Sequence, residues 1–473
     1  MNPRSPGTDL VVVLPGIMGS TLRHDGQLIW APSAGTVLRA VRTLGRNLTA
    51  LTLPEGIGDD HPGDGVEPVT VMPDLHAIPG LWTPVKGYDV LLDRLRRIGY
   101  RETPPGEGAP PGNLLPVPYD WRLSNRYNGI RLAQIVPPAL DRWRSQGGRY
   151  ADAQVVFICH SMGGLIARWY IERCDGAEHT RKLITLGTPT RGAAKALTQL
   201  VNGINPRLGR LAEPLTHFIR SLPSTHQLLP EYACIDHGAD LLKLTEVQQV
   251  TKTPVPELST AMISAAAEFH TTLQAAERAR PAHTTMTHII IGTGQATPTT
   301  ASFDGGMVIP RNTYGPDDLG GDATVPLTGA TPAGSGLDSN TLRRIADKHG
   351  NLQRNPAALD EIESILTTPS ITARGPSDKL ETRVTVPELL LAGEPLPVTV
   401  ELPGEQNHGL RVTLTNEAGH VHDVRTPQPR TGSSATIFTD LPPGAYTVTV
   451  TGLSPTSPLA PISSDTLIWD DPA

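Results

Sequence analysis

The sequence predicts an α/β fold with a doubly wound, mostly parallel sheet, followed by a C-terminal all-β domain. Two observations carry this prediction. First, four short, largely apolar runs lack polar alternation, and helical patterns separate them, as expected of parallel strands covered by helices on both faces. Second, apolar and polar residues alternate from about residue 398 onward, between turns that contain Gly or Pro, which is typical of an antiparallel, immunoglobulin-like sandwich. The four runs are residues 10–14, 155–158, 183–186 and 288–291.

The chain divides into two predicted domains joined by a linker. The α/β domain, residues 1–367, includes an insertion at about 30–85 that is rich in Gly and Pro. This insertion is expected to be a loop that packs over the functional site of the domain. Between about 191 and 282 helical patterns replace strand patterns, so a helical cap is expected there. A Pro- and Gly-containing linker, 368–379, then leads to the sandwich, residues 380–473.

The linker composition predicts few contacts between the two domains, because boundaries of this kind usually separate independently folded units. A chain that ends near Leu366 is therefore expected to fold and to keep the activity of the first domain. The sandwich shows no residues of evident chemical function. Its predicted role is to bind a partner, to shield the first domain or to mediate assembly.

Ser161 marks the point where the second apolar run passes into a helical pattern. The residues two before and two after it, Cys159 and Gly163, are small, as a sharp turn from strand to helix requires. Apolar residues then recur at helical spacing from Met162 to Trp169. This pattern predicts a nucleophile elbow, in which the serine hydroxyl projects above the sheet. The alternative is a serine that merely occupies such a turn.

An acid and a base are predicted downstream of this serine. A serine hydroxyl needs a histidine to accept its proton and a carboxylate to orient that histidine. Asp322 stands in a glycine-rich loop after the fourth apolar run, and His349 follows it on a loop before the last helical pattern. The order Ser, acid, His is the one expected of this chemistry on an α/β fold. Asp304 is the alternative acid, whereas Asp347 is too close to His349 in the sequence to orient it easily.

Two loops are predicted to supply the donors that stabilise the oxyanion of acyl transfer. One donor is the backbone N–H after the nucleophile, which belongs to Met162. The other is expected from the loop after the first apolar run, where Gly16 and Gly19 let the backbone bend toward the serine. Ile17 is the predicted second donor, and Met18 is the alternative.

Six motifs, taken together, resemble those of the lecithin:cholesterol acyltransferase family, which also contains lysosomal phospholipases and phospholipid:diacylglycerol acyltransferases. The motifs are Leu14-Pro15-Gly16-Ile17-Met18-Gly19-Ser20, Tyr119-Asp120-Trp121-Arg122, His160-Ser161-Met162-Gly163-Gly164, Gly187-Thr188-Pro189, Gly292-Thr293-Gly294 and Gly321-Asp322-Ala323-Thr324-Val325-Pro326. The resemblance covers about residues 9–366. It implies an α/β-hydrolase fold, an acyl-enzyme mechanism, and Ser161, Asp322 and His349 as the catalytic triad.

Two other polar segments are predicted to carry no chemistry. In the second motif Asp120 and Arg122 can form a buried ion pair, so this motif is expected to be structural. An acidic cluster in the insertion is expected to be a solvated loop rather than a cation site, because a Pro-Gly pair interrupts it and the ligand spacing of a known loop site is missing. The cluster consists of Asp59, Asp60, His61 and Asp64. The sequence therefore indicates no metal and no cofactor.

Composition excludes several classes of partner. The formal net charge of -7 argues against nucleic acid or an anionic membrane as an electrostatic partner. Cys159, Cys174 and Cys234 are widely spaced without a metal-binding or disulfide pattern, so they are expected to be reduced. No apolar run is long enough for a signal-peptide core or a membrane span, which predicts a cytoplasmic protein. A peripheral contact with a membrane or a protein, through the cap or the sandwich, is compatible with these features.

Two functions from different classes are consistent with the sequence. The first is a serine acylhydrolase or acyltransferase that acts on an ester, either a lipid, a phospholipid or a small ester. The second is a hydrolase fold retained as a binding scaffold, with the sandwich as an interaction module. The three predicted catalytic side chains and the two oxyanion loops favour the enzyme.

Overall fold

The computed structural model describes residues 7–31, 48–73, 87–103, 110–281, 285–335, 342–367, 380, 382–402, 408–428, 432–454 and 457–470. The predicted linker, 368–379, lies outside these residues, as do parts of the predicted insertion.

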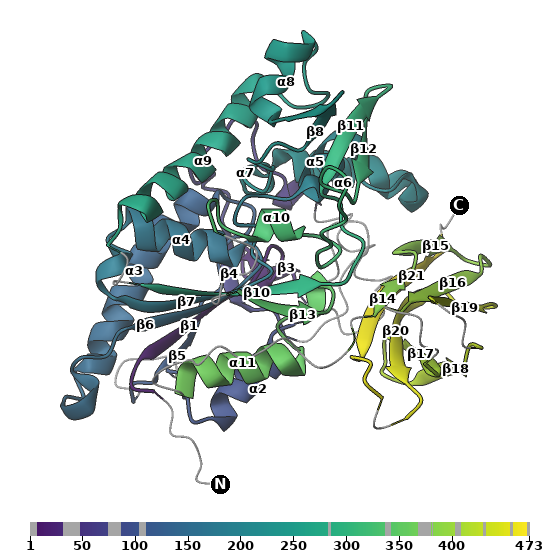
Figure 1. The fold of residues 1–473 in the computed structure, drawn as a ribbon. Helices are drawn as coiled ribbons and strands as arrows, with labels where there is room; N and C mark the ends of the chain where they lie inside the picture. Colours follow the sequence, from purple (N-terminus) through teal and green to yellow (C-terminus); the bar gives the residue numbers. More distant parts are fainter. Residues whose placement is uncertain are drawn as a thin grey trace.

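A six-stranded parallel sheet forms the centre of the first domain (Figure 1). Every neighbouring pair of its strands is parallel. The strand order is β13 (Leu342–Ala346), β10 (Met286–Thr293), β7 (Thr180–Leu186), β6 (Val155–His160), β1 (Leu10–Leu14) and β5 (Leu114–Pro116). The four predicted strands are all present, and β5 and β13 are additional.

The two strands absent from the sequence analysis are the two edges of the sheet. β5 has only three residues and ends at Pro116, and β13 contains Arg343 and Arg344. Proline and charged side chains are tolerated on an edge strand because one side of its backbone needs no partner. These residues interrupt the apolar run by which the inner strands are found.

Helices cover both faces of the sheet (Figure 1). Those of one face are α2 (Asp89–Arg97) and α11 (Pro356–Thr367), and those of the other are α3 (Asn125–Arg144) and α4 (Gly163–Arg173). The even-numbered residues of β1 belong to one apolar core and the odd-numbered residues to a second. Because both faces are buried, the strand is apolar without alternation. The predicted doubly wound fold is confirmed.

The cap contains helices, as predicted, and part of a small four-stranded sheet that was not predicted. Its helices are α5 (Ala194–Asn202), α6 (Ala212–Ser221), α7 (Pro223–His226), α8 (Leu244–Thr251) and α9 (Thr260–Ala279). The sheet has the order β12 (Met307–Arg311), β11 (Thr300–Asp304), β8 (Ile235–His237) and β9 (Asp240–Leu242). Strands of three to five residues are too short to show a periodicity. Among the described residues, no helix is long and apolar enough to cross a bilayer.

The insertion is not entirely a loop, and the prediction is wrong on this point. β4 (Val66–Val71) pairs antiparallel with β2 (Ser20–His24), which also pairs with β3 (Gln27–Trp30). β4 is an edge strand of this small sheet and contains Glu67 and Pro68. An edge strand tolerates such residues, as in β5, so the sequence of β4 shows no strand pattern.

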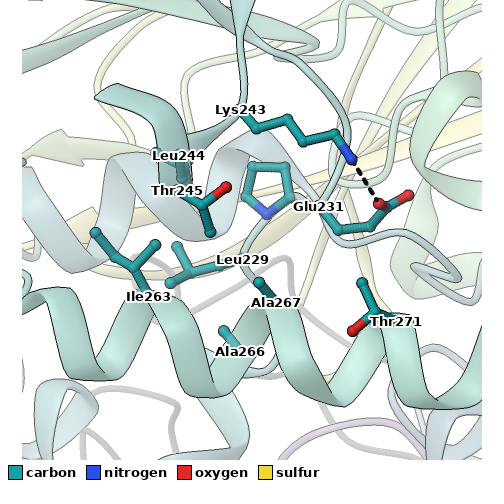
Figure 2. Close-up of a pocket in the computed structure, with 10 residues that line it drawn as sticks. Leu229, Glu231, Lys243, Leu244, Thr245, Ile263, Ala266, Ala267 and Thr271 are labelled. Carbon is teal, nitrogen blue, oxygen red and sulfur yellow. Dashed lines mark ion pairs between the residues drawn. The ribbon is translucent and has the colours of Figure 1, made fainter. Parts of the chain in front are cut away.

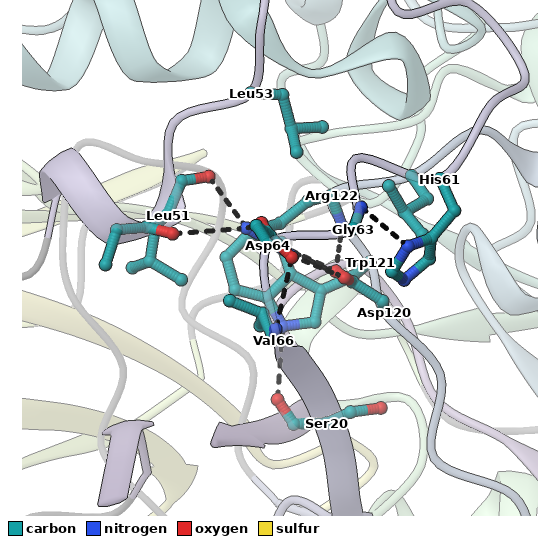
Figure 3. A network of polar contacts seen from close by, with 12 residues as sticks. Ser20, Leu51, Leu53, His61, Gly63, Asp64, Val66, Asp120, Trp121 and Arg122 are labelled. Carbon is teal, nitrogen blue, oxygen red and sulfur yellow. Dashed lines mark hydrogen bonds and ion pairs between the residues drawn. The ribbon is translucent and has the colours of Figure 1, made fainter. Parts of the chain in front are cut away.

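The buried guanidinium of Arg122 ties the insertion to the loop after β5 (Figure 3). Its Nη2 donates to Asp120 Oδ2 at 2.8 Å, and its Nη1 donates to Asp64 Oδ2 at 2.8 Å. Nη1 also reaches the carbonyl oxygen of Leu51 at 3.4 Å. The predicted Asp120–Arg122 pair is confirmed. Asp64 pairs with the buried Arg122 and is not simply part of a solvated acidic loop. The expectation for that residue is therefore corrected.

Replacing Arg122 with methionine should destabilise the fold strongly. The Asp120 carboxylate is only 5% exposed, and it would lose its cationic partner. Removing one partner of a buried ion pair typically costs about 3–5 kcal/mol. Urea unfolding would measure this loss. As a control, Arg23→Met breaks the solvent-exposed Arg23–Glu67 pair, which should change the free energy of unfolding by no more than about 1 kcal/mol. Equal losses in the two variants would contradict the prediction.

The C-terminal domain is a sandwich of a three-stranded and a five-stranded sheet, as predicted. The smaller sheet has the order β14 (Arg383–Thr385), β16 (Leu396–Glu401) and β19 (Ser433–Phe438). The larger has the order β15 (Leu389–Leu391), β21 (Ile462–Trp469), β20 (Gly444–Gly452), β17 (Leu410–Asn416) and β18 (Val421–Arg425). Alternate residues such as Val398, Val412 and Val448 fill its core.

The expectation that few contacts join the two domains is wrong. Leu467 and Trp469 of β21 belong to the apolar core of the first domain, whereas Ile468 between them belongs to the core of the sandwich. The end of β21 is therefore buried on both faces, which the alternating pattern of the earlier strands did not predict. A chain that ends near Leu366 would lose this cover, so we expect it to aggregate or to lose activity rather than to function alone.

Candidate active site

Ser161 lies at the sharp turn between β6 and α4. Its φ of 52° is in the left-handed region, which is uncommon for a residue other than glycine and is typical of a nucleophile elbow. Gly163 is needed two residues later, because a Cβ there would lie 2.4 Å from the carbonyl oxygen of Pro15. The turn therefore packs directly against the loop that follows β1.

His349 connects the other two predicted side chains. Its Nε2 is 2.8 Å from Ser161 Oγ, and its Nδ1 is 2.7 Å from Asp322 Oδ2. A carboxylate only accepts hydrogen bonds, so Nδ1 carries the proton and Nε2 is free to accept from the serine hydroxyl. Ser161 is 7% exposed, Asp322 is 0% exposed and His349 is 4% exposed. This row of three side chains is therefore shielded from bulk water.

The loop around Asp322 holds its carboxylate in a fixed orientation. Oδ1 accepts from the backbone N–H groups of Thr324 at 3.0 Å and Val325 at 2.7 Å, which leaves Oδ2 for His349. The backbone N–H of His349 donates to the carbonyl oxygen of Asp322 at 2.8 Å. The two loops are thus joined through their backbones as well as through their side chains.

Neither the alternative acid, Asp304, nor the rejected Asp347 is the hydrogen-bond partner of the His349 ring. Asp304 is exposed at the end of β11. Asp347 binds its own loop, because Oδ1 accepts from the backbone N–H of Lys348 and Oδ2 accepts from Asn355. Of the aspartates considered, Asp322 is the one beside His349.

Two of the glycine motifs make room for the Asp322–His349 pair. A Cβ on Gly187 would lie 2.9 Å from Asp322 Oδ2 and 3.0 Å from His349 Nδ1, and the φ of +59° at Gly187 also favours glycine. A Cβ on Gly292 would lie 2.4 Å from the Asp322 Cβ. The motifs that begin at these positions therefore have a packing role.

The loop after β1 lies against Ser161, where the predicted oxyanion would form. A Cβ on Gly16 would lie 2.9 Å from the Ser161 Cβ. Within the described residues, the backbone N–H groups of Ile17 and Met162 have no acceptor in the protein, whereas that of Gly16 donates to Tyr88 Oη at 2.7 Å. Ile17 and Met162 are thus available as donors, whereas Gly16 is not.

Tyr88 and His160 form a buried connection between the two sides of the site. Tyr88 Oη lies 2.9 Å from His160 Nδ1, and His160 Nε2 lies 3.0 Å from the carbonyl oxygen of His349. Since a carbonyl only accepts, Nε2 donates and Nδ1 accepts from the tyrosine hydroxyl, which itself accepts from Gly16. A row of hydrogen bonds therefore links the loop after β1 to the backbone of His349. The sequence does not predict this row of hydrogen bonds, because neither Tyr88 nor His160 lies in a pattern that indicates its partner.

Burial keeps several histidines neutral. It lowers the pKa of His160 to about 3, with a further contribution from His349, and it lowers the pKa of His226, His270 and His288 to about 4. The ordinary pKa is 6.5. Between these values the unfolded chain binds more protons than the folded protein does, so stability falls as the pH drops below 6.5.

His270→Gln should therefore reduce the sensitivity of the fold to acid. His270 is 1% exposed and contributes up to about 1.4 kcal/mol of lost stability per pH unit between 6.5 and about 4. Glutamine retains a donor for the carbonyl oxygen of Gln227, which His270 Nε2 contacts at 2.9 Å. Urea unfolding at pH 7, 6 and 5 measures the slope. An unaltered slope in His270→Gln would contradict the assignment.

A pocket in the cap lies apart from this row of side chains (Figure 2). It is bounded by α9, by the start of α8 and by the chain around Leu229, and its lining is mainly apolar. Glu231 and Lys243 form an ion pair of 3.6 Å beside it. None of Ser161, Asp322 and His349 lines this pocket.

Comparison with known proteins supports the resemblance drawn from the motifs. Residues 81–301 match the family model described as lecithin:cholesterol acyltransferase. The human lysosomal phospholipase A and acyltransferase is 31% identical over 118 residues, which are 24% of this chain and 27% of that protein. The rat protein of the same name is 30% identical over 118 residues, with the same coverage. This chain thus matches about a quarter of the length of these relatives.

Solved lipase structures also align with the chain. The propeptide form of the Bacillus licheniformis lipase BlEst2 is 12% identical, with a TM-score of 0.35 over 98% of this chain and 94% of that chain. Its mature form is also 12% identical, with a TM-score of 0.33 over 77% of this chain and 94% of that chain.

Proposed function

We propose that the protein is a serine acylhydrolase or acyltransferase that acts on an ester of a lipid or phospholipid through an acyl-serine intermediate. The observation that carries the proposal is the hydrogen-bonded row from Asp322 through His349 to Ser161. The match of residues 81–301 to the lecithin:cholesterol acyltransferase model supports the substrate class. The activities in the names of the relatives, phospholipase A and acyltransferase, agree with both alternatives for the acceptor.

In the first half of the reaction, Ser161 Oγ attacks the ester carbonyl carbon while its proton passes to His349 Nε2. The carbonyl oxygen becomes an oxyanion, and the backbone N–H groups of Ile17 and Met162 stabilise it. Asp322 stabilises the imidazolium that forms on His349. His349 then gives the proton to the departing alkoxide, the bond between carbonyl carbon and leaving oxygen breaks, and the acyl group stays on Ser161.

In the second half, His349 removes a proton from water or from an acceptor alcohol, whose oxygen attacks the acyl-serine. Collapse of this second oxyanion returns the proton to Ser161 and releases an acid or a new ester. These steps need no metal and no cofactor. Ser161 is 7% exposed, and limited access of water is a condition under which transfer to an alcohol can compete with hydrolysis.

The domain boundaries predicted from the sequence belong to this proposal, with residues 1–367 as the enzyme domain and 380–473 as the sandwich. The relatives are named lysosomal, whereas the cytoplasmic localisation predicted for this chain stays a prediction. The three cysteines are free thiols in the structure, which is compatible with that prediction.

Labelling with a fluorophosphonate tests the proposal, because these reagents phosphonylate an activated serine. We expect mass spectrometry to find one adduct, on the peptide that contains Ser161, and none in Ser161→Ala. Phosphatidylcholine vesicles, a triacylglycerol emulsion and a short-chain nitrophenyl ester, each with and without a long-chain alcohol, then separate the donor classes and distinguish hydrolysis from transfer. A folded wild-type protein without an adduct would overturn the proposal in favour of a binding scaffold.

A further inference from the structure

The loop that carries His349 also contacts the C-terminal sandwich. Lys348, the residue before the histidine, donates from Nζ to Ser464 Oγ of β21 at 2.7 Å. Asn351, two residues after it, donates from Nδ2 to the carbonyl oxygen of Ser463 at 3.1 Å. β21 therefore holds this short 3-10 turn on both sides of the histidine.

The loop that carries Asp322 is joined to the same domain through a lysine of the cap. Lys195 of α5 pairs with Glu388 Oε1 at 3.1 Å, and its Nζ also lies 3.5 Å from the carbonyl oxygen of Ala323. Glu388 immediately precedes β15, and its carbonyl oxygen accepts from the backbone N–H of Leu467 in β21. Ala323 has a φ of 72°, so the loop adopts a conformation beside Asp322 that needs support from its surroundings.

Gln295 makes a second connection to the acid loop. Its side chain is enclosed by the sandwich, since Nε2 donates to the carbonyl oxygen of Thr382 at 3.1 Å and Oε1 accepts from the backbone N–H of Val384 at 3.4 Å. Its backbone N–H donates to the carbonyl oxygen of Gly321 at 3.0 Å, directly before Asp322. Gln295 is 1% exposed, so these hydrogen bonds are protected from water.

A small cavity lies between the two domains, beside the contacts of Lys348 and Asn351. Ala323 and Lys348 line it from the two loops, and Glu388, Ser464 and Asp465 line it from the sandwich. Sandwich residues thus meet the neighbours of both proposed catalytic side chains at one place.

We propose that the C-terminal sandwich is an intramolecular clamp that positions the loops bearing Asp322 and His349, and that Lys348 and Gln295 are positioning residues through which it acts. This inference rests on the proposed function, because the placement of the loops matters only if their side chains carry the reaction. A displacement of about 1 Å in a catalytic group can cost about a hundredfold in rate, so loss of one contact is expected to change turnover measurably.

The test compares Lys348→Met and Ser464→Ala in the full chain, with a short-chain nitrophenyl ester as substrate. Each variant should lower kcat about tenfold or more, with KM and the melting temperature close to those of the wild type. The double variant should be no slower than the slower single variant, because both changes remove the same hydrogen bond. Ser464→Thr retains the hydroxyl and should restore most of the lost activity.

Arg207→Met is the matched control, since it breaks the solvent-exposed ion pair between Arg207 and Glu394 across the same two domains. Its kcat should stay within about twofold of the wild-type value, as expected for an exposed pair. The clamp is wrong if Lys348→Met and Ser464→Ala are as active as the wild type, or if the control loses as much as they do. Should Lys348→Met fail to fold, Ser464→Ala against Ser464→Thr decides the question in the same way.

The wild-type protein separates this inference from the proposed function. A folded wild type that neither hydrolyses the ester nor takes up the fluorophosphonate removes both proposals. An active, labelled wild type whose Ser464→Ala variant keeps full turnover removes only the clamp and leaves the serine mechanism in place.

Discussion

Replacing Ser161 with alanine is expected to lower turnover by about a million-fold. The proposed serine, histidine and aspartate act as a unit, and in a serine protease the loss of the serine alone costs about this much. The hydroxyl is 2.8 Å from His349 Nε2 and lies on a strained turn, so a neighbouring side chain has no evident route to replace it. Steady-state hydrolysis of a short-chain nitrophenyl ester measures the effect.

His349→Ala should show a loss of the same size, and the double variant Ser161→Ala/His349→Ala should be no slower than either single variant. Ser145→Ala, which removes an exposed hydroxyl at the end of α3, is the matched control and should retain full activity. A loss of only about tenfold in Ser161→Ala would show that another group performs the attack.

The parts of the fold that could be predicted are those whose signal lies within one segment. β1, β6, β7 and β10 are inner strands buried on both faces. Successive positions in them therefore require apolar residues, and the sequence shows an unbroken apolar run. β5 and β13 lie at the edges of the sheet, where proline and arginine are tolerated and the run disappears. The same cause concealed β4 in the insertion.

The proposed site follows the same division. Ser161, Asp322 and His349 could be selected because each stands in a local pattern and because their chain order is characteristic of the chemistry. Tyr88 stands in none of the motifs, and His160 precedes Ser161 in one of them, but no residue pattern indicates their hydrogen bonds to each other and to the backbone of His349. Likewise, Lys348 contacts Ser464 only because the sandwich packs against the loop that carries His349. Contacts that no local pattern indicates depend on how distant segments of the chain pack together. A single sequence does not reveal that packing.

The acid of the site is the point at which the sequence left two aspartates open, and Asp322→Asn tests it. Asp322 Oδ1 accepts from two backbone N–H groups, so the asparagine must place its oxygen there and turn its amide NH2 toward His349. The Nδ1 atom of His349 would then have to accept, which puts the proton on Nε2 and leaves the ring unable to take the proton of Ser161.

For this change we expect kcat to fall about ten-thousandfold while the fold is retained, as in the equivalent change of a serine protease. Asp304→Asn, an identical substitution of the exposed aspartate on β11, should leave kcat unchanged. If Asp304→Asn abolished activity and Asp322→Asn did not, the acid would be misassigned. The two substitutions exchange the same carboxyl group for the same amide, and they differ in that Asp322, unlike Asp304, lies within hydrogen-bond distance of His349 Nδ1.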